Sequence, residues 1–319
     1  MRSPGPERGW LVWAALATIY LVWGSTYLAI RIMVETMPPL LAAGVRFALA
    51  GAIFWVALRL AGAEARLRVT RRELLGAGLV GLLLPFGGNG LVTVAEQKVP
   101  SGLAALIIGS VPLWVVVMRS LHRDRVPKTT LAGVAVGFVG LAVLVLPGGR
   151  PEGAPLWGVL VVIAASVSWA AGSFYSSTDR IPLPADPFCS TALQMLLGGS
   201  AMVVVGLIAG EASDVHVAAF SAKSIGALAY LVVAGSLLAF TAYVWLLENA
   251  PISTVATYAY VNPVIAIFLG WAILSEEVTI RVVVGALAIV LSVAAVVRRE
   301  GGAAPTPEAE PEAPVARSR

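Results

Sequence analysis

The chain is a succession of long apolar stretches separated by short polar connections. Each stretch runs for about 20 residues with almost no charge, which is the length needed to cross a hydrocarbon core of roughly 30 Å. Polar residues do not alternate with apolar ones as they do in a lipid-exposed β-barrel. The pattern therefore predicts an all-α integral membrane protein with ten transmembrane helices. The expected helices are Trp10–Ile32, Pro39–Leu58, Leu74–Val94, Ser101–Met118, Thr129–Pro147, Leu156–Ser176, Pro187–Ala209, Ser224–Leu247, Ile252–Leu274 and Ile280–Val297.

Short motifs recur in the second half of the chain in the same order. Pro251–Val264 (PISTVATYAYVNPV) and Val99–Leu113 (VPSGLAALIIGSVPL) each contain two prolines at the same spacing. The stretch Trp23–Tyr27 (WGSTY) likewise resembles Gly172–Tyr175 (GSFY). Both pairs share an offset of about 150 positions, which predicts two repeats of five helices. Because five is odd, the second repeat must be inverted in the membrane, as in many secondary transporters. The expected repeats cover residues 10–147 and 156–298.

Composition and charge agree with a membrane protein and predict its orientation. Apolar residues make up 58% of the chain and charged residues only 13%, about half the charged fraction of a soluble domain. The net charge of +4 comes from Lys and Arg in the connections, and most of these lie on the side of the N-terminus. We therefore expect both termini in the cytoplasm. Residues 301–319 are rich in Ala, Pro and Glu, which predicts a disordered cytoplasmic tail.

The first apolar stretch of the chain is interpreted as a transmembrane helix and not as a cleaved signal peptide. The first apolar stretch is too long for a signal peptide, and Arg31 follows it without a small-residue cleavage pattern. The single cysteine, Cys189, excludes an intrachain disulfide.

Four stretches form a recognisable ordered set: Trp23–Tyr27, Pro39 with Val45–Phe47, Val99–Pro112 and Tyr260–Val264. This set resembles the EamA-type permeases of the drug/metabolite transporter superfamily, and the similarity extends from about Trp10 to Arg298. The resemblance implies a ten-helix fold with a central cavity. It also implies export of amino acids, other small metabolites or drugs across a bacterial inner membrane, without selecting one substrate.

Pro112 and Pro263 lie in the middle of the expected fourth and ninth helices. A proline removes one backbone hydrogen bond and displaces the carbonyl four residues before it. An unsatisfied carbonyl is costly in lipid, so a broken helix should face protein or water. We expect both breaks to line the transport path, with a packing kink as the alternative.

Polar and aromatic side chains share helix faces near these breaks. On the ninth helix, Thr254, Tyr258 and Asn262 lie four positions apart, and Ser110 is the counterpart in the fourth. Substrate contact and hydrogen bonding between helices both account for them. The first and sixth helices carry aromatic side chains, which suit either the walls of a cavity or an aromatic belt at the membrane surface. The third helix carries an amide flanked by glycines, which suits either cavity lining or close packing. The expected cavity residues there are Tyr20, Trp23, Tyr27, Asn89, Trp169 and Ser173.

Few charges lie inside the expected helices. Arg46 is two turns from the outer end, so we expect it to extend to that surface or to meet Glu35. The alternative is that Arg46 binds a substrate carboxylate. Glu96, at the end of the third helix, is the best candidate for a proton site if the chain has one.

The residues available for chemistry argue against an enzyme. His122 and His216 lie in loops on opposite sides of the membrane, and Cys189 is the only thiol, so no metal site or activated nucleophile is expected. We expect a secondary transporter with alternating access, a small-molecule substrate and the lipid bilayer as partners, and neither cofactor nor nucleic acid. A channel or a non-transporting membrane subunit is the alternative. The oligomeric state is open, and a monomer is compatible with the sequence.

Overall fold

The computed structural model describes residues 6–124, 126–146, 154–177 and 180–302, and every regular element in these ranges is a helix. The first half of the chain contains α1 (Pro6–Met33), α2 (Pro39–Leu60), η1 (Glu64–Leu67), α3 (Arg71–Gly81), η2 (Leu82–Gly90), α4 (Leu91–Ala95), α5 (Ser101–Ile108), α6 (Val111–Leu121) and α7 (Lys128–Val145). The second half contains α8 (Leu156–Ser176), α9 (Pro187–Ile208), η3 (Glu211–Asp214), η4 (Val217–Ala219), α10 (Ala222–Tyr230), η5 (Leu231–Leu238), α11 (Ala239–Asn249), α12 (Ile252–Val255), α13 (Tyr258–Leu274) and α14 (Ile280–Gly302).

These elements make up ten membrane helices. Within the described ranges, nine helical segments are long and apolar enough to cross a membrane, and the shorter apolar helix Tyr258–Leu274 is the tenth. The all-α, ten-helix prediction is therefore confirmed, and the protein is a multi-pass membrane protein. The predicted tail is partly wrong, because Gly301 and Gly302 continue α14. Residues 303–319 of that tail lie outside the described residues.

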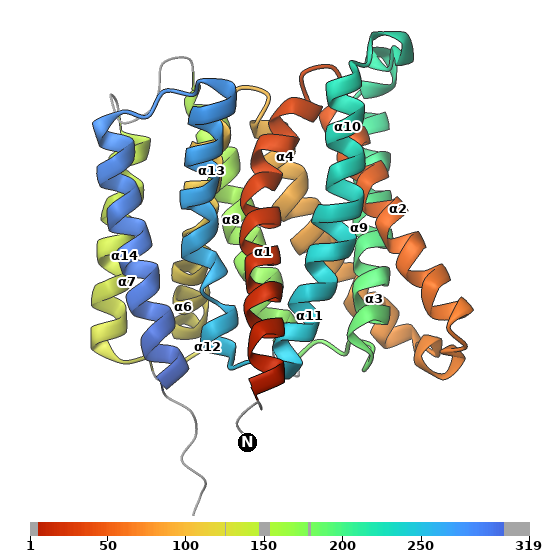
Figure 1. Ribbon diagram of the computed structural model, residues 1–319, viewed down its shortest axis with the longest axis horizontal. Coiled ribbons are helices and arrows are strands. Elements are labelled where there is room, and N and C mark those ends of the chain that lie inside the picture. Colours follow the sequence, from red (N-terminus) through yellow and green to blue (C-terminus); the bar gives the residue numbers. More distant parts are fainter. Residues whose placement is uncertain (1–5, 125, 147–153, 178–179, 303–319) are drawn as a thin grey trace, which may run out of the picture.

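Figure 1 shows the helices standing side by side, with the start of α1 and the end of α14 at the same end of the molecule. We call this the lower end and the opposite one the upper end. Helix α2 packs along α9 on one flank, and α7 packs along α14 on the other. Helix α1 stands between them and packs against α11 and α13. Each contact joins the two halves of the chain, and we call the surface around α1 the seam.

A shared irregularity shows that the halves are repeats. The segments η2 and η5 are π-helical, and they occupy equivalent positions in the third and eighth membrane helices. In η2, Ser168 Oγ donates to the Leu83 carbonyl at 2.8 Å. In η5, Trp23 Nε1 donates to the Gly235 carbonyl at 3.1 Å. Each π-helix thus receives a hydrogen bond from the first helix of the other repeat, and π-helical turns are frequent at functional sites.

The fourth and ninth membrane helices are both interrupted. The fourth ends at Ile108 and restarts at Val111, just before Pro112, and Ser110 Oγ donates to the Ile107 carbonyl at 2.6 Å. The ninth is interrupted at Ala256–Thr257.

The sequence suggested that the ninth helix is broken at Pro263. That expectation is wrong, because this proline lies inside α13. Its missing N–H leaves the Ala259 carbonyl without its usual helical donor, while the backbone stays helical on both sides of the proline. The two repeats meet at the interruption of the fourth helix: a Cβ placed on Gly109 would lie 2.8 Å from Pro263 Cγ.

Candidate functional site

Three aromatic rings from three helices meet at the seam. Trp23 of α1 lies 5.2 Å between ring centroids from both Tyr243 of α11 and Tyr258 of α13. Tyr243 and Tyr258 are 5.9 Å apart and nearly perpendicular. Such edge-to-face contacts stabilise by about 0.5–1.5 kcal/mol each beyond the area buried. We call these three residues the aromatic cluster; it places two of the predicted cavity residues in contact across the repeats.

The interruption of the ninth helix lies beside the aromatic cluster and is tied to α1. The Tyr20 hydroxyl forms a hydrogen bond with Thr257 Oγ1. Thr257 Oγ1 in turn lies 2.5 Å from the carbonyl of Thr254. Tyr20 and Thr254 were predicted as cavity residues, and the structure places both at this interruption.

Arg46 reaches the seam from α2 and does not extend to the outer surface. The side chain is 4% exposed, and its Nε donates to Ser236 Oγ of η5 at 3.0 Å. Its guanidinium also lies over the Phe47 ring, 4.5 Å from the centroid. Within the described part of the chain, Nη1 is buried without a hydrogen-bond partner. The expectation of a surface position or of a contact with Glu35 is therefore wrong, because Ser236 and Phe47 hold the guanidinium inside.

Two further predicted residues are buried near the crossing of the fourth and ninth helices. Asn262 is 8% exposed, and its Oδ1 has no partner among the described residues. Ser110 is fully buried, and its hydroxyl serves the backbone of its own interrupted helix. Tyr27, half-buried on α1, packs against the apolar cores on both sides of the seam. Of these groups, Asn262 is the one whose side-chain acceptor is unpaired within the described residues.

A second contact between the repeats joins the third and sixth helices. Trp169 packs on the backbone of η2, where a Cβ on Gly88 would lie 2.4 Å from its ring. The neighbouring Asn89 is half-buried, and its carbonyl accepts from Thr93 Oγ1 at 2.8 Å. Ser173 lies one turn further along α8 and is also half-buried. The glycines beside Asn89 thus allow close packing, and Trp169 belongs to this contact rather than to the aromatic cluster.

Glu96 lies at the upper end, directly after α4. It is 0% exposed, and neither carboxylate oxygen has a hydrogen-bond partner in the described ranges. Arg31 of α1 donates from Nη1 to the backbone carbonyl of Glu96, not to its side chain. Glu96 is therefore a buried carboxyl group with two cationic neighbours, Arg31 and Arg46, and no donor.

Two glutamates of the second repeat bind the N-terminal turns of two helices of the first repeat. Glu211, after α9, accepts from the backbone N–H groups of Leu40 and Leu41 at 3.1 and 2.8 Å. Glu276, after α13, accepts from those of Ser101 and Gly102 at 2.7 and 3.0 Å. We call these contacts the carboxylate caps. Carboxylates stabilise helix N-termini, where backbone N–H groups lack partners.

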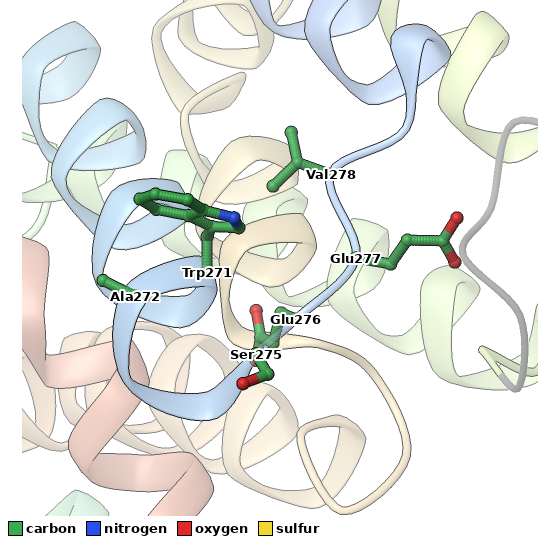
Figure 2. A pocket seen from close by; sticks show the side chains of 6 residues that line it. All are labelled: Trp271, Ala272, Ser275, Glu276, Glu277 and Val278. Atoms are coloured by element: carbon green, nitrogen blue, oxygen red, sulfur yellow. The ribbon is translucent and has the colours of Figure 1, made fainter.

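The hollow in Figure 2 lies beside one of these caps. It has a volume of about 590 Å³ and is lined by Trp271, Ala272, Ser275, Glu276, Glu277 and Val278. Figure 2 shows the side chains of Glu276 and Glu277 pointing in different directions. None of the predicted cavity residues lines this hollow, so it is not the candidate site.

Sequence reasoning missed several residues that complete the seam. They are Arg31, Ser236, Tyr243, Thr257 and Glu276. A signal was present on the eighth helix, where Ser236 and Tyr243 are two turns apart and share a face. On α1, Arg31 continues the stripe of Trp23 and Tyr27 at the same spacing of four.

The arrangement is suited to binding rather than to bond chemistry. Among the described residues, no three His, Cys, Asp or Glu side chains group as metal ligands. The seam instead offers aromatic faces, a guanidinium donor and an amide acceptor. These groups recognise aromatic or apolar, anionic and hydrogen-bonding parts of a small molecule, respectively.

Known proteins resemble this chain in sequence and in fold. The profile of the "EamA-like transporter family" matches residues 8–146 and 156–298. The "Uncharacterized inner membrane transporter YedA" of Escherichia coli (strain K12) is 40% identical over 269 residues, 84% of each chain. A "Probable amino-acid metabolite efflux pump" of the same strain is 26% identical over 279 residues, 82% of this chain and 86% of the relative. A solved crystal structure, 20% identical, shares the fold with a TM-score of 0.62 over 91% of this chain and 98% of its own.

Proposed function

Since this chain belongs to the EamA-like transporter family, we propose that it exports small, amino-acid-like metabolites across the inner membrane by alternating access. The two repeats would rock against each other around the seam, so that the aromatic cluster and Arg46 face each side in turn. The family and the transporters among its relatives point to transport and not to an enzyme.

The observation that carries the proposal is the state of Arg46. A cation inside a membrane protein is expensive to bury and is normally paired. Here one nitrogen of a nearly fully buried guanidinium has no partner, while another is held by Ser236 of the opposite repeat. A substrate carboxylate would supply the missing acceptor, and the aromatic cluster would contact its side chain. Asn262 Oδ1 would accept from the substrate amino group.

Support for the substrate class also comes from relatives. The name of one full-length relative is "Probable amino-acid metabolite efflux pump". An amino acid combines the carboxylate, the ammonium group and the apolar or aromatic side chain for which the seam offers partners. The inner membrane location is supported by the relative named as an inner membrane transporter.

Counterflow in proteoliposomes tests the proposal. Purified protein is reconstituted with an unlabelled amino acid inside, and uptake of the same labelled amino acid is followed across a panel of the twenty. We expect a saturable overshoot for a subset of the panel, which a channel does not produce. Decarboxylated analogues of the active amino acids should fail to compete. No overshoot with any amino acid would contradict the proposed substrate class.

Arg46→Gln tests the role of the guanidinium. Removing the cation should raise the half-saturating concentration at least tenfold, because a charge-assisted hydrogen bond contributes about 1.5–3 kcal/mol. Arg59→Gln, on the exposed last turn of the same helix, is the matched control and should keep the wild-type value. An unchanged half-saturating concentration in Arg46→Gln would remove Arg46 from the site.

A further inference from the structure

The side chain of Glu96 is in an environment that an ionised carboxylate does not tolerate. It is 0% exposed, and both oxygens lack a donor in the described part of the chain. An ionised carboxylate without hydrogen bonds is strongly disfavoured away from water, and the usual response is to take up a proton. The contrast with Glu211 and Glu276 is direct, because each of those carboxylates accepts two backbone N–H groups at the same end of the molecule.

The charged neighbours of Glu96 come from several elements. Helix α1 contributes Arg31, whose guanidinium is bonded to the Glu96 carbonyl, together with the phenol of Tyr27. Helix α2 contributes Arg46, which is held by Ser236. The turn after α13 contributes the like charge of Glu276. Of the remaining neighbours, η2 carries no ionisable residue, α8 carries only Tyr175 in its last turn, and Lys98 is exposed.

The effects of burial and of these charged groups on the pKa of the Glu96 carboxyl do not cancel. Burial is the largest and, with Glu276, it raises the pKa of the Glu96 carboxyl well above its ordinary value of 4.5, while Arg31 and Arg46 oppose the rise. Neither arginine forms an ion pair with the carboxyl within the described residues. The neutral acid is therefore the form that fits this buried site.

We propose that Glu96 is the proton-binding site through which export by this protein is driven by the proton gradient; this rests on the proposed function. With the upper end open, a proton from the external water binds a Glu96 oxygen and converts the carboxylate to the acid. The upper end then closes over the neutral group. When the lower end opens and water reaches Glu96 past Tyr27 and Arg46, the proton passes to the cytoplasmic water. One proton enters for each substrate molecule that leaves.

The first test needs no substrate. A raised pKa means that the folded protein holds this proton more tightly than the unfolded chain, so stability falls as the pH rises above 4.5. We expect the apparent unfolding temperature of the purified protein to fall by about 3 °C or more between pH 5 and pH 8. Glu96→Gln, which mimics the neutral acid, should unfold near the wild-type temperature at pH 5 and lose most of this fall.

The stability test has a control variant and two results that would contradict the proposal. Glu277→Gln removes an exposed carboxylate in the same region and should keep the wild-type pH dependence. Wild type and Glu96→Gln falling alike with pH would overturn the proposal. A large loss of stability in Glu96→Gln at pH 5 would also overturn it, because it would mean that Arg31 and Arg46 require an ionised partner.

The second test uses transport. In proteoliposomes, an imposed pH gradient should let the wild-type protein concentrate the amino acid with the strongest counterflow. Glu96→Gln should lose at least tenfold of the gradient-driven accumulation when accumulation is divided by the counterflow rate of the same variant. Equal accumulation by both proteins would overturn the proposal. Absence of counterflow in the wild type would instead contradict the proposed function, and the stability test would still decide the proton site.

Discussion

At the scale of the residue, Trp23 shows how one side chain joins helices of both repeats at the seam. Its indole N–H satisfies a carbonyl of the π-helix η5, and its ring contacts Tyr243 and Tyr258. A π-helix shifts backbone hydrogen bonds by one residue, so a carbonyl that needs an external donor commonly results. The same residue therefore stabilises an irregular helix and forms one wall of the candidate site.

Trp23→Phe should separate these two contributions. A smaller aromatic ring takes the place of the indole and the donor to the Gly235 carbonyl is lost, leaving a buried acceptor unsatisfied at a cost of about 1–3 kcal/mol. We expect a lower unfolding temperature by about 2–6 °C, with counterflow retained at permissive temperature. The exposed Trp157 provides the control, since Trp157→Phe should not shift the midpoint. Equal midpoints for both variants would show that the bond to Gly235 contributes nothing.

Tyr258→Leu probes the aromatic cluster as a substrate wall. The change removes both ring contacts of Tyr258 and keeps an apolar side chain of similar size. We expect affinity for aromatic amino acids to fall at least fivefold relative to aliphatic ones, measured by competition in counterflow. Trp271→Leu, on the exposed face of the same helix, should leave this ratio unchanged. A uniform fall for all substrates would indicate a packing role only.

At the scale of the element, the sequence predicted the positions of the helices along the chain well and the contacts between helices poorly. The starts and ends of the helices follow from apolar length and from Pro39, Ser101, Leu156 and Pro187, because lipid imposes both constraints on the local chain. The π-helices were not predicted, because they depend on donors supplied by Trp23 and Ser168 from the opposite repeat.

Arg46 is the clearest case of a tertiary effect. Its distance from the helix end favoured a surface position, but Gly235 leaves room for the guanidinium: a Cβ there would lie 3.3 Å from Arg46 Nη2. Neither that space nor the bond to Ser236 can be derived from α2 alone. The stripe of Tyr20, Trp23 and Tyr27 was readable because it lies on one helix. Its partners on α11 were not, because the pairing of helices is set by the whole bundle.

Glu276→Gln tests the role of a carboxylate cap. The neutral amide retains one acceptor and loses the charge that favours the N-terminus of α5. In a protein with Cys189→Ala, a thiol introduced as Val99→Cys lies just before the capped turn at a fully buried position. We expect a water-soluble maleimide to label this thiol at least threefold faster when Glu276→Gln is present. The exposed Glu277→Gln should leave the rate unchanged, and equal rates in all three proteins would contradict a closing role for the cap.

At the scale of the whole molecule, inversion explains why equivalent elements serve different ends. The two π-helices and the two interrupted helices are related by the repeat, and the fourth and ninth helices cross where Gly109 approaches Pro263. Motion at that crossing would open one end as the other closes, since each repeat presents the same irregular helix to the opposite side.

The orientation is testable independently of transport. The start of α1 and the end of α14 lie at the same end, and Lys and Arg are concentrated in the connections there. Reporter fusions to both termini should be active only in the cytoplasm. A periplasmic signal from either terminus would reverse the proposed orientation.

The carboxylate caps make the two ends of the molecule unequal despite the inverted repeats. Both caps join the second repeat to the first at the upper end, and each hydrogen bond to a charged group contributes about 1.5–3 kcal/mol. At the lower end the halves are linked by Arg66 and Asp186 at 3.5 Å, with Arg66 63% exposed, and such a pair contributes about 0–1 kcal/mol. In the proposed mechanism this difference would favour opening of the lower end when substrate and gradient are absent. In the proposed orientation the carrier would rest facing the cytoplasm, and loading from inside would be its default first step.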